Sequence, residues 1–119
     1  MHEVAREVLE ACEAAIMPGK PMGDVFAAHA KVFDKAGLSH ARFNACGYAM
    51  GAIYNLIWVD FPMFYENNPN LMGERQVFFL HMILVDNDIG LVMCLGHSVE
   101  VSAQGAKRLS RHSLELFGL

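Results

Sequence analysis

The chain has 119 residues and a net charge of −4, with its Lys and Arg residues scattered along it. This length predicts one domain, residues 1–119, with a single hydrophobic core. Without a basic stripe, nucleic acid is not an expected partner. No apolar run is long enough to span a membrane, and the start, Met1–Val4, is too acidic and too broken for a signal peptide. We therefore expect neither a nucleic-acid partner nor a membrane partner.

The composition also points to a covered surface and to a reducing compartment. Hydrophobic residues make up 54% of the chain and charged residues only 18%, which is apolar for a monomer of this size. We expect part of the surface to be covered by another chain or by a missing segment. Cys12, Cys46 and Cys94 are odd in number and far apart, which argues against a disulfide framework or a zinc site. They are typical of small buried residues in a cytoplasmic protein.

Two amphipathic helices are predicted at the start of the chain. The first covers about Glu3–Met17 and ends at Pro18–Pro21. The second covers about Asp24–Ala36, with Asp24 as its N-cap and Gly37 as its stop. His29 lies on the apolar face of the second helix. A hydrogen-bonded core or rim histidine is favoured there over a metal ligand, because no ligand partner stands four residues away.

The middle of the chain, Ser39–Arg75, shows no clear periodicity, and we predict a long irregular connection there. It contains Gly47–Gly51 and an aromatic-rich stretch that includes Tyr54 and Trp58. These aromatic side chains either line a substrate pocket or pack against a partner subunit. The residues alone do not choose between the two.

The last part of the chain predicts an antiparallel meander. An apolar run, Val77–Val85, is followed by the turn-like Asn87-Asp88 and by a second strand, Gly90–Leu95. His97–Ser102 predicts a third strand, and a turn leads from it to Ala106–Leu109. Two helices followed by such a meander indicate an α+β fold.

His81 is the one ionisable group at the centre of Val77–Val85, a run that we predict to be a strand buried on both faces. An imidazole in that position must be hydrogen-bonded, kept neutral, or used. His81 is therefore either a core histidine bonded to a backbone carbonyl or a functional group.

Four segments, in this order, carry a resemblance to a known family. Glu13–Gly19 (EAAIMPG) resembles EAAIAAIRPG of that family, and Gly47–Gly51 (GYAMG) resembles GHGIG. Gln76–Met82 (QVFFLHM) resembles MVFTIEP, and Val101–Ser110 (VSAQGAKRLS) resembles VTEDGPERLT. The family is that of the creatinase/aminopeptidase domain, the pita-bread fold. The resemblance spans nearly all of this chain but only the C-terminal half of that domain, and it implies two N-terminal helices on a curved antiparallel sheet.

The departures from that family concern its metal ligands. Its peptidases hold two metal ions with two Asp from the first half of the domain, and with one His and two Glu from the second. Here Tyr48 matches the GHGIG histidine, His81 matches the IEP glutamate, and Gly96 matches the last glutamate. A further histidine of the family falls near Asn55. Because such metals need a carboxylate-rich shell, the resemblance implies no metal and no cofactor at these positions.

One branch of the family matches better. Gly47–Gly51 together with Phe79–Ile83 (FLHMI) is similar to the ectoine hydrolase-like members, which show GYSIG and FHMI. Like creatinase, those members imply metal-independent hydrolysis of C–N bonds, amide or amidine, in small polar solutes. The catalytic residues implied are His81 as the proton-transfer group and Tyr48 as its neighbour. The residues implied for substrate binding are Arg42, Tyr54 and Trp58.

Two other functions stay open, because half of the family's domain is absent. One is a catalytically silent half-domain that acts as a binding or subunit-interaction module. The other is a Xaa-Pro peptidase-like metallopeptidase, against which the lost ligands speak. A lone half also exposes the surface that its other half would cover. Besides a small-molecule substrate, we therefore expect a C2 homodimer or a missing N-terminal half as the partner.

Overall fold

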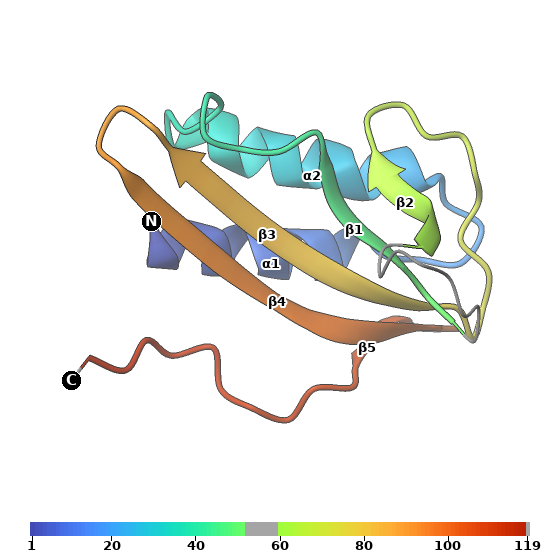
Figure 1. Cartoon of the computed structure of the whole chain (residues 1–119). Coiled ribbons are helices and arrows are strands. Elements are labelled where there is room, and N and C mark those ends of the chain that lie inside the picture. The colour runs from blue at the N-terminus through green and yellow to red at the C-terminus, as the bar shows by residue number, and fades with distance from the viewer. Residues whose placement is uncertain (52–59, 119) are drawn as a thin grey trace.

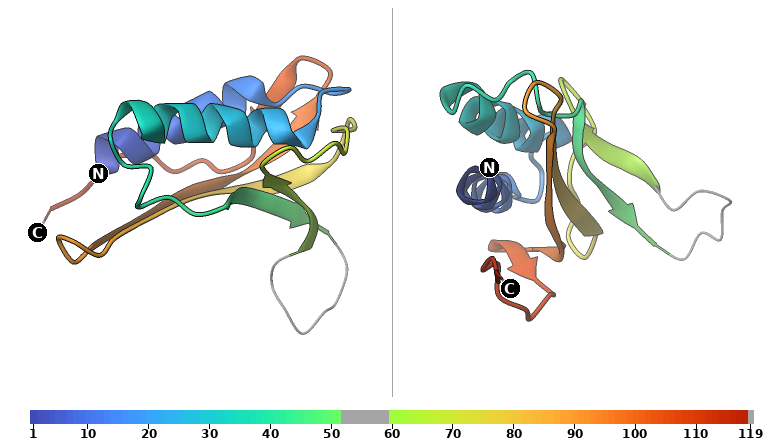
Figure 2. Two further views of the ribbon diagram at one scale, coloured as in Figure 1. Left: turned by 90° about the horizontal axis from the view of Figure 1, so that it is seen from above. Right: turned by 60° about the vertical axis from the view of Figure 1, so that its left-hand side comes forward.

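The computed structural model describes residues 1–51 and 60–118, and in it two helices pack on one face of an antiparallel sheet (Figures 1 and 2). The sheet has five strands in the order β2-β1-β3-β4-β5. The α+β fold is thus confirmed. In the described part of the chain, no helix is long and apolar enough to cross a membrane. The elements are α1 (His2–Ala15), α2 (Met22–Lys35), β1 (Ala45–Met50), β2 (Asp60–Tyr65), β3 (Val77–Asp86), β4 (Leu91–Ser102) and β5 (Gly105–Arg108).

The core lies between the helices and the face of the sheet that they cover. Every second residue of β3, from Phe78 to Leu84, is fully buried there. Each such side chain contributes about 1.5–3 kcal/mol by leaving water. From the helices, Val8, Leu9 and Phe33 are fully buried against the same core. The apolar stripes predicted from the helical spacing therefore face the sheet.

β3 is covered on one face, which corrects the prediction of a strand buried on both faces. Its residues alternate between buried and half-buried along the whole strand. Phe79, His81 and Ile83 are half-buried on the face turned away from the helices. Apolar side chains also occupy this second face, so the sequence shows a continuous apolar run. Without alternating polar residues, the run does not reveal that one face of the strand is open. His81 consequently lies on the open face of the sheet.

The second helix begins earlier than predicted, and Asp24 is not its N-cap. Pro21 holds that position, and Asp24 lies in the first turn. The first backbone N–H groups of α2 find other partners: Met22 donates to the carbonyl of Asn70 at 2.8 Å and Gly23 to that of Asn68 at 3.0 Å. A segment far along the chain therefore supplies the acceptors that the first N–H groups of a helix need. The sequence near the helix cannot reveal such distant partners.

The segment predicted to be irregular contains two strands, which is a further correction. β1 runs next to β3, with Gly47 opposite Leu80, and β2 pairs with its other side. A Cβ at Gly47 would lie 2.7 Å from the carbonyl oxygen of Phe79, so only glycine fits this approach. The small residues that allow this close approach give β1 little hydrophobic periodicity, so the strand was not predicted from the sequence. Tyr54 and Trp58 lie outside the described residues.

β4 is one strand where two were predicted. It pairs with β3 without a break, with His81 opposite Gly96 at its middle. The sequence predicts a boundary at Gly96, between Gly90–Leu95 and His97–Ser102. In the structure a Cβ at Gly96 would lie 2.5 Å from the carbonyl oxygen of Leu80 and 2.8 Å from Cζ of Phe79. Glycine here allows a close approach inside a strand and does not end it.

Candidate functional site

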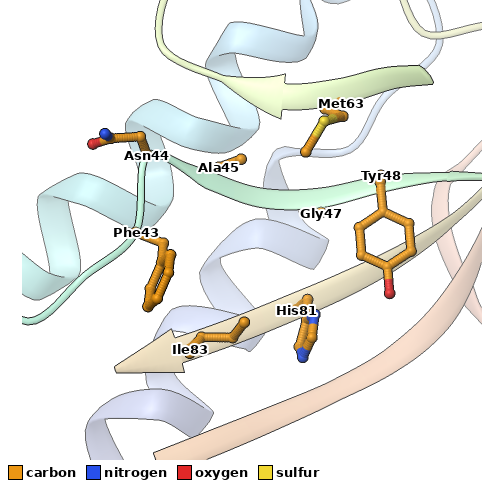
Figure 3. A pocket seen from close by; sticks show the side chains of 8 residues that line it. All are labelled: Phe43, Asn44, Ala45, Gly47, Tyr48, Met63, His81 and Ile83. Atoms are coloured by element: carbon orange, nitrogen blue, oxygen red, sulfur yellow. The ribbon is translucent and has the colours of Figure 1, made fainter. Parts of the chain in front are cut away.

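A hollow of about 400 Å³ is lined by His81 and Ile83, which lie on the face of the sheet that the helices leave uncovered. It lies over β1 and β3, and Figure 3 shows the side chains around it. The described part of its lining is mostly apolar, with one imidazole, one phenol and one amide, which is the usual make-up of a small-molecule pocket. The lining residues are Phe43, Asn44, Ala45, Gly47, Tyr48, Met63, His81 and Ile83.

The two predicted catalytic residues, Tyr48 and His81, meet at this hollow. They come from the neighbouring strands β1 and β3, and their rings project to the same side of the sheet (Figure 3). The ring centroids are 6.1 Å apart with an interplanar angle of 73°. The ring of Phe79 touches both, at 5.6 Å from Tyr48 and 5.1 Å from His81. These contacts, edge-to-face at His81 and tilted between Phe79 and Tyr48, restrain the orientation of the two polar rings.

A third polar group, Cys94 on β4, joins the imidazole. Nε2 of His81 and Sγ of Cys94 lie 3.0 Å apart, within hydrogen-bond distance. With Nδ1 carrying the ring proton, Nε2 accepts the S–H of the thiol. Cys94 is exposed whereas Cys12 and Cys46 are buried, so the prediction of three buried cysteines is wrong for Cys94. It stands two residues from Gly96, the partner of His81, and therefore shares the open face.

Burial shifts the pKa values of both ionisable rings so that their neutral forms are favoured. Loss of hydration lowers the pKa of His81, so the imidazole is neutral at pH 7 and able to accept a proton. Burial raises the pKa of Tyr48, and the nearby Cys94 raises it further. The phenol is thus protonated and can donate a hydrogen bond. The pair has the protonation states of a general base beside a neutral donor.

Arg42 does not lie at this hollow. Its Nε is 3.5 Å from a carboxylate oxygen of Asp34, and its guanidinium lies 5.5 Å from the centre of the Phe26 ring. It lines a neighbouring hollow with His40. Its neighbour Phe43 lines both this hollow and that of Tyr48. Substrate binding by Arg42 stays a prediction that this arrangement does not support.

The residues present do not fit the two-metal centre that the resemblance would otherwise imply. Among the described residues, no carboxylate lines the hollow of Tyr48 and His81. At Gly96, the ring of Phe79 occupies the space that a side chain would enter, because it lies 2.8 Å from an ideal Cβ there. The position matched to the last glutamate is therefore filled by an aromatic ring. A neutral phenol, an imidazole and a thiol do not form the oxygen-rich shell that such metals prefer.

Another group of possible metal ligands lies elsewhere. Among the described residues, the ligand atoms of His40, Asp86 and Asp88 lie within 4.8 Å of one another near the turn that joins β3 and β4. Oδ1 of Asp86 accepts the backbone N–H groups of Asp88 at 3.1 Å and Ile89 at 3.4 Å. These bonds explain the buried carboxylate as part of the turn.

The sequence contained a signal for Cys94 that the prediction did not use. In the structure Asp86 pairs with Leu91, and every later pair of β3 and β4 follows from that turn. A hairpin closed by the four residues 87–90 places Gly96 opposite His81 and Cys94 diagonally beside it. Phe43 and Met63 had no such signal, because β1 and β2 were not predicted.

A comparison with protein families matches residues 1–105 to metallopeptidase family M24. The chain belongs to this family. The match confirms the creatinase/aminopeptidase resemblance, whereas the ectoine hydrolase-like branch stays a prediction. A comparison with curated protein sequences finds no match.

Solved structures share the fold at low identity. An X-Pro aminopeptidase from Thermotoga maritima MSB8 is 16% identical, with a TM-score of 0.86 over 98% of this chain and 32% of that one. The dipeptidase PepE from Mycobacterium ulcerans is 20% identical, with a TM-score of 0.85 over 97% of this chain and 30% of that one. The N-terminal domain of the FACT complex subunit SPT16 from chickpea is 16% identical, with a TM-score of 0.77 over 95% of this chain and 28% of that one. The chain thus spans about a third of each, and these likenesses show the pita-bread fold alone.

Proposed function

We propose that this chain carries part of a hydrolase site of the ectoine hydrolase- or creatinase-like kind. The site acts on amide or amidine C–N bonds of small polar solutes and needs no bound metal. His81 is the proton-transfer group and Tyr48 is a neutral hydrogen-bond donor beside it. The observation that carries the proposal is their meeting at an apolar hollow of about 400 Å³, whose lining, in the part of the chain that the structure describes, includes no carboxylate.

The physical basis is the environment of the two rings. The imidazole, which burial keeps neutral, would take a proton from a water that attacks a carbonyl or amidine carbon in the hollow. The C–N bond would then break as the imidazolium returns that proton to the leaving nitrogen. The phenol, whose pKa burial raises, would donate to the developing negative charge. Phe43, Met63 and Ile83 would exclude water from the remaining surface of the solute.

The test compares wild type with His81→Ala and Tyr48→Phe on ectoine, creatine and Xaa-Pro dipeptides, with and without added Mn²⁺. We expect metal-independent turnover of a small C–N solute, lowered about 100-fold or more in His81→Ala and about tenfold in Tyr48→Phe. His112→Ala, at an exposed histidine outside the site, serves as the matched control. Metal-stimulated cleavage of the dipeptides would instead support the peptidase reading.

A second candidate, from a different class, is a binding or subunit-interaction module. It is favoured by the likeness to a domain of a complex subunit, the chickpea SPT16. Well-folded protein that turns over none of the three substrates, alone or with the partner named below, would favour this module over the enzyme.

The same open face suggests the partner. We propose a C2 homodimer, or a missing N-terminal half, seated against the side of the sheet formed by β1 and β2. Phe43, Met50, Phe61 and Tyr65 lie on or beside these strands and are exposed over 42–70% of their surface. Light scattering should show a dimer at micromolar concentration, and a stable monomer would contradict it. The gene sequence upstream of Met1 tells a natural half from part of a longer protein. The free thiols support a cytoplasmic location.

A further inference from the structure

The exposed thiol on β4 lies beside the imidazole of the proposed site. Of the three cysteines, Cys94 alone is exposed, and its sulfur lies 3.0 Å from Nε2 of His81. A thiol beside a neutral imidazole is the arrangement of an activated nucleophile and its base. His81 also lines the hollow.

Cys94 lies on β4, which pairs with β3, one of the strands that line the hollow. Cys94 pairs directly with Ile83, which lines the hollow together with His81. The charge of a thiolate at Cys94 would also raise the pKa of the Tyr48 phenol. A thiol and a neutral hydrogen-bond donor therefore lie on either side of the base, on the strands that flank β3. Three strands position them, because Tyr48, His81 and Cys94 come from β1, β3 and β4.

We propose that Cys94 is the nucleophile of this site, with His81 as its base and Tyr48 as the donor to the developing charge. The proposal rests on the proposed function and deepens it, because it replaces direct attack by water with a covalent intermediate. The substrate class is an electrophilic carbon bound to nitrogen, the carbonyl carbon of an amide or the central carbon of an amidine.

The reaction has two balanced halves. First, Nε2 of His81 takes the thiol proton, the sulfur bonds to the substrate carbon, and the C–N bond breaks as the leaving nitrogen takes the proton from His81. The product is an amine and a thioester, or a thioimidate from an amidine. Then His81 takes a proton from water, the new C–O bond forms, and the C–S bond breaks. The electron pair of that bond returns to sulfur, which regains the proton from His81.

The first experiment measures the thiol itself. Native protein is treated with iodoacetamide, and the rate at each cysteine is followed by peptide mass spectrometry. We expect Cys94 to react at least about tenfold faster in wild type than in His81→Gln, as expected when a base is lost. His112→Gln, at an exposed histidine elsewhere, should leave the rate unchanged. The buried Cys12 and Cys46 are internal controls that react after unfolding.

The second experiment traps the intermediate with an activated ester, p-nitrophenyl acetate. Wild type should release one equivalent of nitrophenol in a burst and carry one hydroxylamine-sensitive acetyl group on Cys94. Cys94→Ser should show neither, and His81→Gln should acylate at least about tenfold more slowly. Equal alkylation and acylation in wild type and folded His81→Gln would overturn the nucleophile–base pair.

The two proposals fail in different ways. If Cys94→Ser keeps full turnover of a C–N substrate that His81→Ala has lost, the nucleophile is wrong and the proposed function stands. If alkylation and acylation at Cys94 depend on His81 but no C–N substrate is turned over, the thiol site stands and the proposed hydrolase is wrong. Circular dichroism and thermal melts of each variant establish that it is folded.

Discussion

Glu13 connects α1 to the far edge of the sheet, and its replacement by Ala should be strongly destabilising. Its carboxylate accepts two hydrogen bonds from Arg108 on β5, from Nε at 3.0 Å and from a terminal nitrogen at 2.9 Å. It also contacts Nε2 of His97 on β4. The side chain of His97 is fully buried, and its Nδ1 has no hydrogen-bond partner in the described part of the chain. One carboxylate thus joins three elements.

The magnitude follows from the exposure of each partner. The side chain of Arg108 is 36% exposed, so its bonds to Glu13 contribute about 0.2–1 kcal/mol. The imidazole of His97 is 0% exposed, and leaving it without a partner costs about 1–3 kcal/mol. The better helix propensity of Ala offsets about a few tenths of a kcal/mol of this destabilisation. Glu13→Ala should therefore lower the free energy of unfolding by about 2–3 kcal/mol, or the Tm by roughly 10 °C.

Urea unfolding followed by circular dichroism measures this loss. Glu7→Ala is the matched control, because Glu7 is an exposed residue of the same helix, and it should change stability by less than about 0.5 kcal/mol. Glu13→Gln keeps an acceptor for Arg108 without the charge and should fall between the two. If Glu13→Ala unfolds like Glu7→Ala, the carboxylate does not join these elements and the reasoning is refuted.

Three further predictions concern other parts of the molecule. Burial lowers the pKa of His29 from 6.5 to about 4, so the unfolded chain binds more protons between these values and stability falls as the pH drops through that window. Urea unfolding at several pH values measures this loss in the free energy of unfolding. His29→Leu should remove up to about 3 kcal/mol of it, whereas His112→Leu should lose stability with pH as the wild type does. Gly96→Ala, which places a Cβ 2.5 Å from a backbone oxygen, should cost about 1–3 kcal/mol, with Gly118→Ala as the neutral control; equal melting temperatures would contradict the contact. Protein purified without a His-tag should carry no stoichiometric manganese, cobalt, zinc or iron by elemental analysis; metal that is bound in wild type and lost in His81→Ala would contradict the site as described.

The sequence by itself determined the features that depend on neighbouring residues. Helical spacing revealed both helices, and the apolar run around His81 revealed β3. The four family-like segments indicated the fold that the family match confirms. Each of these signals lies within a few turns or one strand, because the period of a helix or strand is a local property.

Only the tertiary structure decided what lies beside what. It capped α2 with Asn68 and Asn70, kept β4 continuous through Gly96, and brought Cys94 to His81. It also turned Arg42 toward Asp34 and away from the hollow. These outcomes depend on strand register and on close backbone approach between distant segments. A shift of one residue in register would move every side chain of a strand to the opposite face of the sheet, so local periodicity leaves them undetermined.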